Sequence, residues 1–225
     1  MRPTGNGYGG VRPAAVPATL DGVYDPGGCG RGMARIDLAD PEDLPADQRE
    51  LLESLSPKEG LPEEYHHLVE SPVRNIYRTV GRSLPILEAF REFARSVWSE
   101  CGLEPREREI VILTVGRALD AAYEWHQHVR VGLSEGLTPE EIAAIGADDR
   151  AFFEGRDRAL VELAAGFAAG SLDAPTLEVF VDHFDEPTAV GTGVLVGIYA
   201  TIGLLESGFD IGTEEPFVGW GLDGL

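Results

Sequence analysis

The sequence predicts an all-α fold. Apolar residues recur at helical spacing from residue 45 onward, and no segment alternates apolar and polar residues as a half-buried strand does. Prolines stand at the starts of these periodic stretches and glycines stand at their ends, which is the usual asymmetry of helix termini. We therefore expect a compact domain of several helices without a sheet.

The expected helices follow one another closely. Pro62, Pro85, Pro139 and Pro175 each begin one, because a proline in the first turn lacks only an N–H that would have no partner within the helix. Thr138 precedes one of these prolines as an N-cap, whose hydroxyl can accept a backbone hydrogen bond. In chain order, the predicted helices span residues 46–55, 62–69, 71–80, 85–99, 106–119, 121–134, 139–145, 155–168, 175–184 and 188–207.

Two of these helices are expected to lie deep in the domain. Helix 106–119 is apolar around nearly its whole circumference, which indicates burial on all sides. Helix 188–207 interleaves glycines with aliphatic residues, so its helicity must come from burial rather than from intrinsic propensity. Its small residues predict close packing against a neighbour, either within the domain or in another subunit.

The charge of the chain excludes one class of partner. Asp and Glu number 39 against 18 Lys and Arg, which gives a net charge of −21, and Lys58 is the single lysine. Binding nucleic acid requires a basic patch that neutralises phosphates, so we expect no nucleic-acid partner. A surface this acidic suits a protein that works in concentrated salt, where the Debye length falls to roughly 3 Å at 1 M. We therefore predict a halophilic protein.

Cysteine usage and hydropathy favour a cytoplasmic protein. Cys29 and Cys101 lie far apart and form no Cys-x-x-Cys pair, so the sequence predicts neither a redox motif nor a zinc knuckle. The N-terminal segment lacks the continuous apolar core of a signal peptide. The longest apolar run, about residues 190–205, falls short of the roughly 20 residues that a membrane-spanning helix needs. We expect no membrane partner.

The composition changes near residue 33. Residues 1–32 hold nine glycines and four prolines, with three Arg against two Asp, whereas the remainder holds 15 basic and 37 acidic residues. We interpret 1–32 as an arm that is disordered or not natively translated, with translation starting at Met33, and 33–225 as one helical domain. An ordered extension that wraps a neighbouring subunit is the alternative.

The candidate chemistry lies in the segment Tyr-Glu-Trp-His-Gln-His. Glu124 and His128 are four residues apart, so on a helix they share a face and can act on one bound molecule. We expect Asp120 to cap this helix, which would place Glu124 in its first turn beside the positive end of the helix dipole. Glu109, on the preceding apolar helix, could fold back toward the same pocket.

The neighbouring residues have several interpretations. Glu124 and His128 could form a solvated surface pair, but an exposed face would not usually carry Tyr123 and Trp125 beside it. Tyr123 could donate a hydrogen bond in a pocket or pack in the core, and Trp125 is a core, interface or substrate-binding residue. His126 points to nearly the opposite side of the helix from His128.

A metal site is another arrangement that these residues could form. Glu124 and His128 with His66 or His67 could in principle surround a zinc ion, but the spacing of these residues is not typical of zinc sites. We therefore expect neither a metal nor another cofactor.

The segments REREIVILTV, AAYEWHQHV and GLTPEEIAAI resemble the carboxymuconolactone decarboxylase and alkylhydroperoxidase D-like family. The resemblance extends more loosely over the flanking helices, from about residue 64 to residue 211. Peroxidases of this family carry a Cys-x-x-Cys pair with a histidine shortly after it and a glutamate twelve residues before it. Matched residue by residue, the cysteine positions are Ala121 and Glu124, the histidine is His128 and the glutamate is Glu109.

Because the two cysteines are absent, the resemblance is to the decarboxylase branch of the family. The decarboxylase branch carries no cysteine pair and has a Tyr-Glu-Trp-x-x-His pattern like the one here. It implies a cofactor-free enzyme that decarboxylates or isomerises a small carboxylated or lactone substrate. Catalysis would then fall to Glu109, Glu124 and His128, with Tyr123 and Trp125 as substrate-binding residues. The resemblance also implies an all-helical domain that assembles into homotrimers or homohexamers.

Two other functions stay open at this stage. A peroxidase or antioxidant protein would have to use Cys29 or Cys101, because the family's thiol positions hold other residues. A non-catalytic helical oligomer would carry the same residues as scaffold alone.

Overall fold

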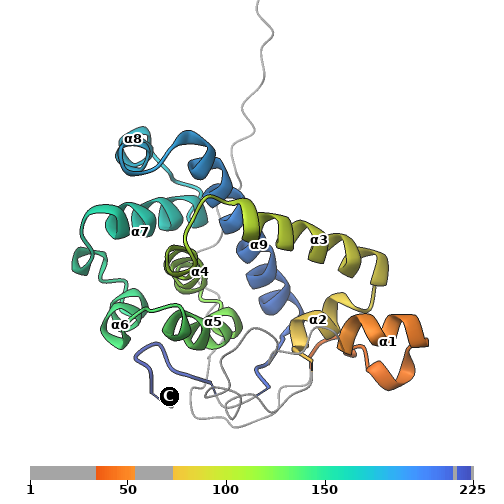
Figure 1. The fold of residues 1–225 in the computed structure, drawn as a ribbon. Coiled ribbons are helices and arrows are strands. Elements are labelled where there is room, and N and C mark those ends of the chain that lie inside the picture. Colours follow the sequence, from red (N-terminus) through yellow and green to blue (C-terminus); the bar gives the residue numbers. More distant parts are fainter. Residues whose placement is uncertain (1–33, 54–72, 215–216, 224–225) are drawn as a thin grey trace, which may run out of the picture. The chain divides into compact units, whose positions relative to one another are not determined.

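The computed structural model describes residues 34–53, 73–214 and 217–223 (Figure 1). The chain divides into two units, Met1–Gly30 and Arg31–Leu225, and all described residues belong to the second. The predictions for the arm 1–32, for helix 62–69 and for Lys58, His66 and His67 lie outside the described residues.

The described residues form helices and the loops between them, so the expectation of an all-α fold is confirmed for this part of the chain. From residue 84 onward the helix ends agree with the predicted ones to within two residues. The helix expected over 71–80 is described only as the shorter α2. In chain order the elements are η1 (Pro41–Asp43), α1 (Ala46–Glu53), α2 (Asn75–Val80), α3 (Leu84–Glu100), α4 (Pro105–Ala118), α5 (Ala122–Ser134), α6 (Pro139–Gly146), η3 (Arg150–Phe152), α7 (Gly155–Ala168), α8 (Ala174–His183) and α9 (Glu186–Phe209).

Side-chain caps explain where several helices begin. Thr138 accepts a hydrogen bond from the N–H of Glu141, and the Glu141 carboxylate accepts one from the N–H of Thr138, which completes a capping box for α6. Asp173 and Asp185 cap α8 and α9 through a hydrogen bond each, in which the side chain accepts a backbone N–H of the first turn. These hydrogen bonds lower the pKa of both carboxyl groups. The prediction of Thr138 as an N-cap is confirmed.

The predicted cap of α5 is wrong. Asp120 lies in the left-handed region, with φ of 53°, and its exposed side chain is 3.9 Å from Arg117, so it does not face the first turn of α5. The N-cap position is Ala121, which has no acceptor in its side chain. Glu206 of α9 supplies one instead, because its Oε1 accepts the N–H of Tyr123 at 2.7 Å. A carboxyl group distant in sequence therefore accepts a hydrogen bond from the first turn of α5.

Helix α4 lies at the centre of the contacts. It packs against α5, α6, α7 and α9 (Figure 1), and its residues from Glu109 to Gly116 are all buried. The prediction of a central helix is confirmed. Burial on every side follows from its apolar circumference.

Helix α9 packs closely through its small residues. A Cβ added at Gly191 would meet the backbone oxygen of Cys101 at 2.5 Å, so only glycine fits where α9 passes the end of α3. Close packing within the domain is thus confirmed at this point. By length and composition α9 is long and apolar enough to cross a membrane. Its buried face packs against α4, α7 and α3, as the core helices of water-soluble proteins also do.

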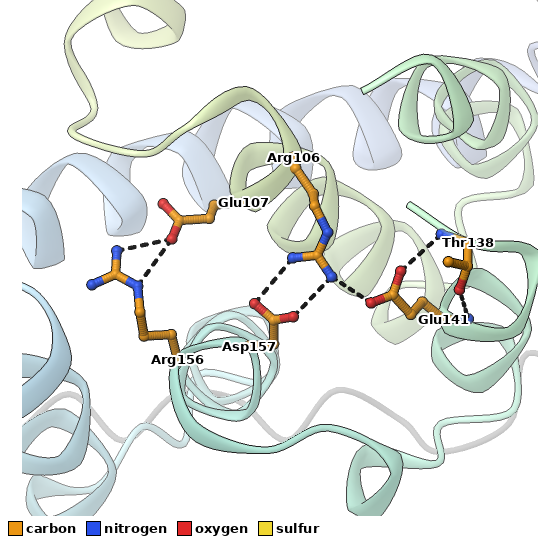
Figure 2. Close-up of polar contacts among 6 residues, drawn as sticks. All are labelled: Arg106, Glu107, Thr138, Glu141, Arg156 and Asp157. Atoms are coloured by element: carbon orange, nitrogen blue, oxygen red, sulfur yellow. Dashed lines mark hydrogen bonds and ion pairs between the residues drawn. The ribbon is translucent and has the colours of Figure 1, made fainter. Parts of the chain in front are cut away.

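A polar network joins α4, α6 and α7 (Figure 2). Arg106 pairs with Asp157 of α7 at 2.8 Å and also with Glu141, the capping-box residue of α6. Glu107 accepts the N–H of Glu104 as a cap for α4 and also pairs with Arg156 at 2.8 Å. Each of these two glutamates therefore both caps a helix and ties it to another.

Candidate active site

His128 of α5 and Glu109 of α4 form a buried hydrogen bond. The Glu109 side chain is fully buried, and its Oε2 lies 2.8 Å from Nδ1 of His128. Because a carboxylate only accepts hydrogen bonds, the Nδ1 nitrogen carries the proton in this contact. The contact fixes the plane of the ring and directs Nε2 away from α4.

Glu124 lies on the other side of the imidazole. Its Oε2 is 3.6 Å from Nε2 of His128, which is the shared helix face that the spacing predicts. Burial raises the pKa of Glu124, and the nearby carboxylates of Glu109 and Glu214 raise it further, while His128 and Arg74 oppose the shift. The imidazole is thus held between two buried acids whose environments differ.

A cavity of about 450 Å³ adjoins these residues. Its volume is in the range of small-molecule sites in proteins. Glu124 and His128 lie on its wall, whereas Glu109 lies behind His128. The lining residues are Arg74, Ile76, Tyr77, Phe90, Arg91, Ala94, Arg95, Trp98, Tyr123, Glu124, Gln127, His128, Val131, Glu135, Ile198, Tyr199 and Ile202.

Tyr199 of α9 completes the surroundings of the imidazole. Its ring meets the ring of His128 edge-on, with 5.0 Å between centroids, and it also lines the cavity. Burial raises the pKa of Tyr199 well above its ordinary value, and the carboxylates of Glu124 and Glu109 raise it further. The phenol therefore stays protonated near neutral pH and can donate a hydrogen bond.

Tyr123 lines the cavity, but its hydroxyl already has partners. It donates to Oε1 of Glu214 at 2.8 Å and accepts the N–H of Ile76 at 3.3 Å. Gln127 donates to the other oxygen of Glu214, also at 2.8 Å. Glu214 thereby ties the segment after α9 to α5 and to the start of α2, which brings Arg74 to the cavity.

Trp125 and His126 lie away from the cavity. Trp125 is fully buried, its ring centroid is 5.0 Å from that of Trp220, and its Nε1 donates to the carbonyl of Gly219 at 3.2 Å. This places it in the core and separates it from the residues that line the cavity. The Nδ1 of His126 accepts the N–H of Val218, so this histidine does point away from His128, as its position in the helix predicts.

The Cys101 thiol lies apart from this site. Cys101 is buried and reduced at the end of α3 and does not line the cavity, while Cys29 lies outside the described residues. Within the described ranges, no group of three His, Cys, Asp or Glu side chains is arranged to hold a metal ion. The other members of the metal hypothesis, His66 and His67, are outside those ranges.

Several site residues were missed by sequence reasoning. Tyr199, Glu206 and Glu214 lie 70 to 100 residues beyond the motif and reach it only through packing. Arg74 precedes α2 and gives no periodic signal. One signal was available for Tyr199, because it is the single hydroxyl-bearing aromatic residue in the glycine-rich helix 188–207.

The fold and the site of the described residues define a class: a helical domain in which a buried Glu-His-Glu arrangement adjoins a cavity, with the histidine and one glutamate on the cavity wall. Residues 85–166 match the model of the carboxymuconolactone decarboxylase family. This match confirms the resemblance carried by the sequence motifs. No curated protein matches the chain.

Solved structures share the fold at low sequence identity. The debrominase Bmp8, in a cysteine-to-alanine variant bound to 2,3,4-tribromopyrrole, is 14% identical with a TM-score of 0.62, and the match covers 77% of this chain and 90% of that one. A candidate antioxidant defence protein of the AhpD type from Agrobacterium tumefaciens, itself of unknown function, is 21% identical with a TM-score of 0.55. That match covers 60% of this chain and 94% of the other. At these identities the likeness establishes the fold alone.

Proposed function

We propose that this protein is a cofactor-free acid/base enzyme that acts on a small carboxylated or lactone substrate. One observation carries the proposal: His128 lies on the cavity wall between two buried carboxyl groups, with Nδ1 bound to Glu109 and Nε2 facing Glu124. General acid–base catalysis requires such a positioned proton donor within reach of the substrate.

The geometry divides the work among the three residues. Glu109 holds the imidazole in one tautomer and orientation, and so acts through His128 rather than on the substrate. Glu124 faces the cavity with a pKa raised by burial, which favours its protonated form and suits a partner acid. His128 carries the proton to or from the substrate at Nε2.

A decarboxylation would proceed as follows. The bond between the substrate carbon and its carboxylate breaks, carbon dioxide leaves, and the electron pair moves into an enolate. The Tyr199 hydroxyl donates a hydrogen bond to the enolate oxygen, and the preorganised donor stabilises the charge that develops there. Glu124, whose raised pKa favours its protonated form, passes a proton to Nε2 of His128. The Nε2–H of the resulting imidazolium then protonates the carbon, and solvent returns a proton to Glu124. Isomerisation of a lactone would use the same donors and acceptors.

The first test is carbon dioxide release from 4-carboxymuconolactone in molar potassium chloride. We expect release by the wild-type protein and none by His128→Ala with the same helicity by circular dichroism. His183→Ala serves as a matched control, because this histidine lies at the end of α8 and does not line the cavity. Equal release by wild type and His128→Ala would contradict the role of His128. An inert wild type would exclude this substrate and lead to a panel of lactones and β-keto acids.

A thiol peroxidase is the second candidate, favoured only by the likeness to an AhpD-type protein. Such a mechanism needs an accessible thiolate and a resolving partner, and Cys101 is 2% exposed. We expect any activity to survive the double replacement Cys29→Ser and Cys101→Ser. Loss of activity in that folded variant would favour the peroxidase.

The assembly and setting are part of the proposal. Val190 and Leu204 of α9 are 69% and 73% exposed, an unusual exposure for aliphatic residues on an otherwise buried helix. They support a homotrimer or homohexamer in which α9 contacts another subunit. We propose that this oligomer works in a salt-rich cytoplasm, as the net charge of −21 suggests.

A further inference from the structure

We propose that the cavity binds an aromatic anion, with its ring against the aromatic wall and its acidic group at Arg91 and Arg95 of α3. The proposal rests on the proposed function only in taking the same cavity as the substrate site. It narrows the substrate from any small carboxylate to one whose acid and reacting atom are separated by a flat ring.

The first argument is the face that α3 presents. Phe90, Arg91, Ala94, Arg95 and Trp98 all line the cavity, and their spacing places them on one stripe of the helix. Aromatic side chains therefore stand at both ends of this stripe and two guanidinium groups stand between them. Such an arrangement offers a stacking surface and an anion site on one rigid element.

The second argument is the charge around the cavity. Arg74, Arg91 and Arg95 line it together with two acids, Glu124 and Glu135, in a chain whose net charge is −21. Ion pairs among the described residues use other arginines, namely Arg106, Arg117, Arg150, Arg156 and Arg158. A local concentration of arginine on an acidic protein attracts anions to this cavity.

The third argument is the aromatic character of the walls. Trp98 and Tyr199 approach His128 from α3 and α9, with ring centroids 6.2 and 5.0 Å from that of the imidazole. The guanidinium of Arg108 lies over the Trp98 ring at 4.6 Å, which holds the ring in place. Tyr77, Phe90 and Tyr123 add further aromatic surface. Flat rings pack well against such walls.

The helix sets the length of the ligand. Arg95 and Arg91 precede Trp98 by three and seven residues, so they lie about 4.5 and 10.5 Å from it along the helix axis. Since Trp98 lies beside His128, an anion held at this pair is roughly 5–10 Å from the proton donor. A ligand of one or two fused rings spans that distance.

Binding of three matched probes tests the proposal without turnover. 2-Naphthoate has the ring and the charge, 2-naphthamide keeps the ring without the charge, and decahydro-2-naphthoate keeps the charge without the flat ring. We expect calorimetry in low salt to show naphthoate binding roughly 10-fold more tightly than naphthamide, and more tightly than the saturated acid. Molar potassium chloride should reduce the difference in affinity between naphthoate and naphthamide, because salt screens exposed charges.

Variants locate the binding determinants. Arg91→Gln combined with Arg95→Gln should abolish the difference between naphthoate and naphthamide, whereas Arg82→Gln, an exposed arginine outside the cavity, should keep it. Phe90→Leu should weaken both aromatic probes, whereas Phe93→Leu, on the exposed side of α3, should not.

Three results would overturn the proposal: equal affinity for the acid and the amide, equal affinity for the flat and the saturated acid, or no binding of naphthoate at millimolar concentration. The two proposals can fail separately. A wild-type protein that is inert toward the whole substrate panel but still discriminates the probes would refute the acid/base function alone, whereas an active protein that does not discriminate them would refute the aromatic-anion proposal alone.

Discussion

The Oε2 atom of Glu109 lies 2.8 Å from Nδ1 of His128, inside the contact between α4 and α5. The hydrogen bond joins two helices that are consecutive in sequence, and both partners are buried. Its effect is to select the imidazole tautomer that leaves Nε2 facing the cavity. The orientation of His128 therefore depends on a residue that does not itself line the cavity.

Glu109→Gln should remove the selection of the His128 tautomer without creating a cavity. The glutamine has nearly the same shape, but its amide nitrogen can donate to Nδ1 and so favour the wrong tautomer. We expect kcat to fall roughly 100-fold or more, with KM little changed, because the group acts through His128. Glu107→Gln is the matched control on the same helix, since Glu107 pairs with Arg156 away from the site. A normal kcat in Glu109→Gln would contradict the orienting role.

Tyr199→Phe tests the donor to the enolate oxygen. The variant keeps the ring beside His128 and removes only the hydroxyl. Loss of one preorganised donor should lower kcat by roughly 100- to 1,000-fold. The measurement is steady-state turnover, with the thermal unfolding midpoint as a check on folding. An unchanged kcat would assign Tyr199 to packing alone.

Glu206 predicts a dependence of stability on pH. Burial raises its pKa to about 8, and the carboxylate of Glu124 adds to the shift, although the N–H of Tyr123 opposes it. The unfolded chain releases this proton near its ordinary pKa of about 4.5, while the folded protein keeps it up to about pH 8. Between these values the contribution of Glu206 to the free energy of unfolding falls by roughly 1.4 kcal/mol per pH unit.

Glu206→Gln should remove this dependence, because the amide keeps an acceptor for Tyr123 but does not titrate. We expect the variant to gain stability relative to wild type as the pH rises from 5 to about 8. Chemical denaturation of both proteins across that range measures the difference, and titrations common to the two cancel. A difference that stays constant with pH would contradict the buried, protonated state of Glu206.

Two glycines of α9 should respond in opposite directions to replacement by alanine. At Gly191 the new methyl group would meet the Cys101 backbone at 2.5 to 2.9 Å, and backbone cannot move aside cheaply. We expect Gly191→Ala to cost about 1–3 kcal/mol. At Gly197 nothing lies within 4 Å, so Gly197→Ala should gain up to about 1 kcal/mol from helix propensity. Urea denaturation measures the stability of each variant relative to the wild type. Destabilisation by both replacements would show that Gly197 also packs against a neighbour.

Arg106 should contribute more to stability than an arginine paired within one helix. It joins α4 to both α6 and α7 (Figure 2). Arg158, by contrast, pairs with Glu162 four residues along α7. We expect Arg106→Gln to cost roughly 1 kcal/mol and Arg158→Gln only about 0.3–0.5 kcal/mol, since Arg106 is partly exposed and its pairs are screened. Equal losses of unfolding free energy for the two variants in urea denaturation would show that the contacts of Arg106 between helices add nothing to stability.

The sequence determined the helices and the local half of the site. Helical periodicity, first-turn prolines and the apolar circumference of 106–119 predicted the elements, because these signals lie within one or two turns. The spacing of Glu124 and His128 predicted their shared face for the same reason. Glu109 was predicted as the acid of the preceding apolar helix that could fold back toward the pocket, and the structure places it against His128.

Only the tertiary structure decided what surrounds these residues. It buried Trp125 in the core, replaced the expected cap Asp120 by Glu206, and brought Tyr199, Glu214 and the arginines of α3 to one cavity. No local pattern encodes such contacts, since they join residues that are tens of positions apart and depend on how the helices pack. The sequence thus fixes which side chains one helix offers, and the packing decides which of them meet.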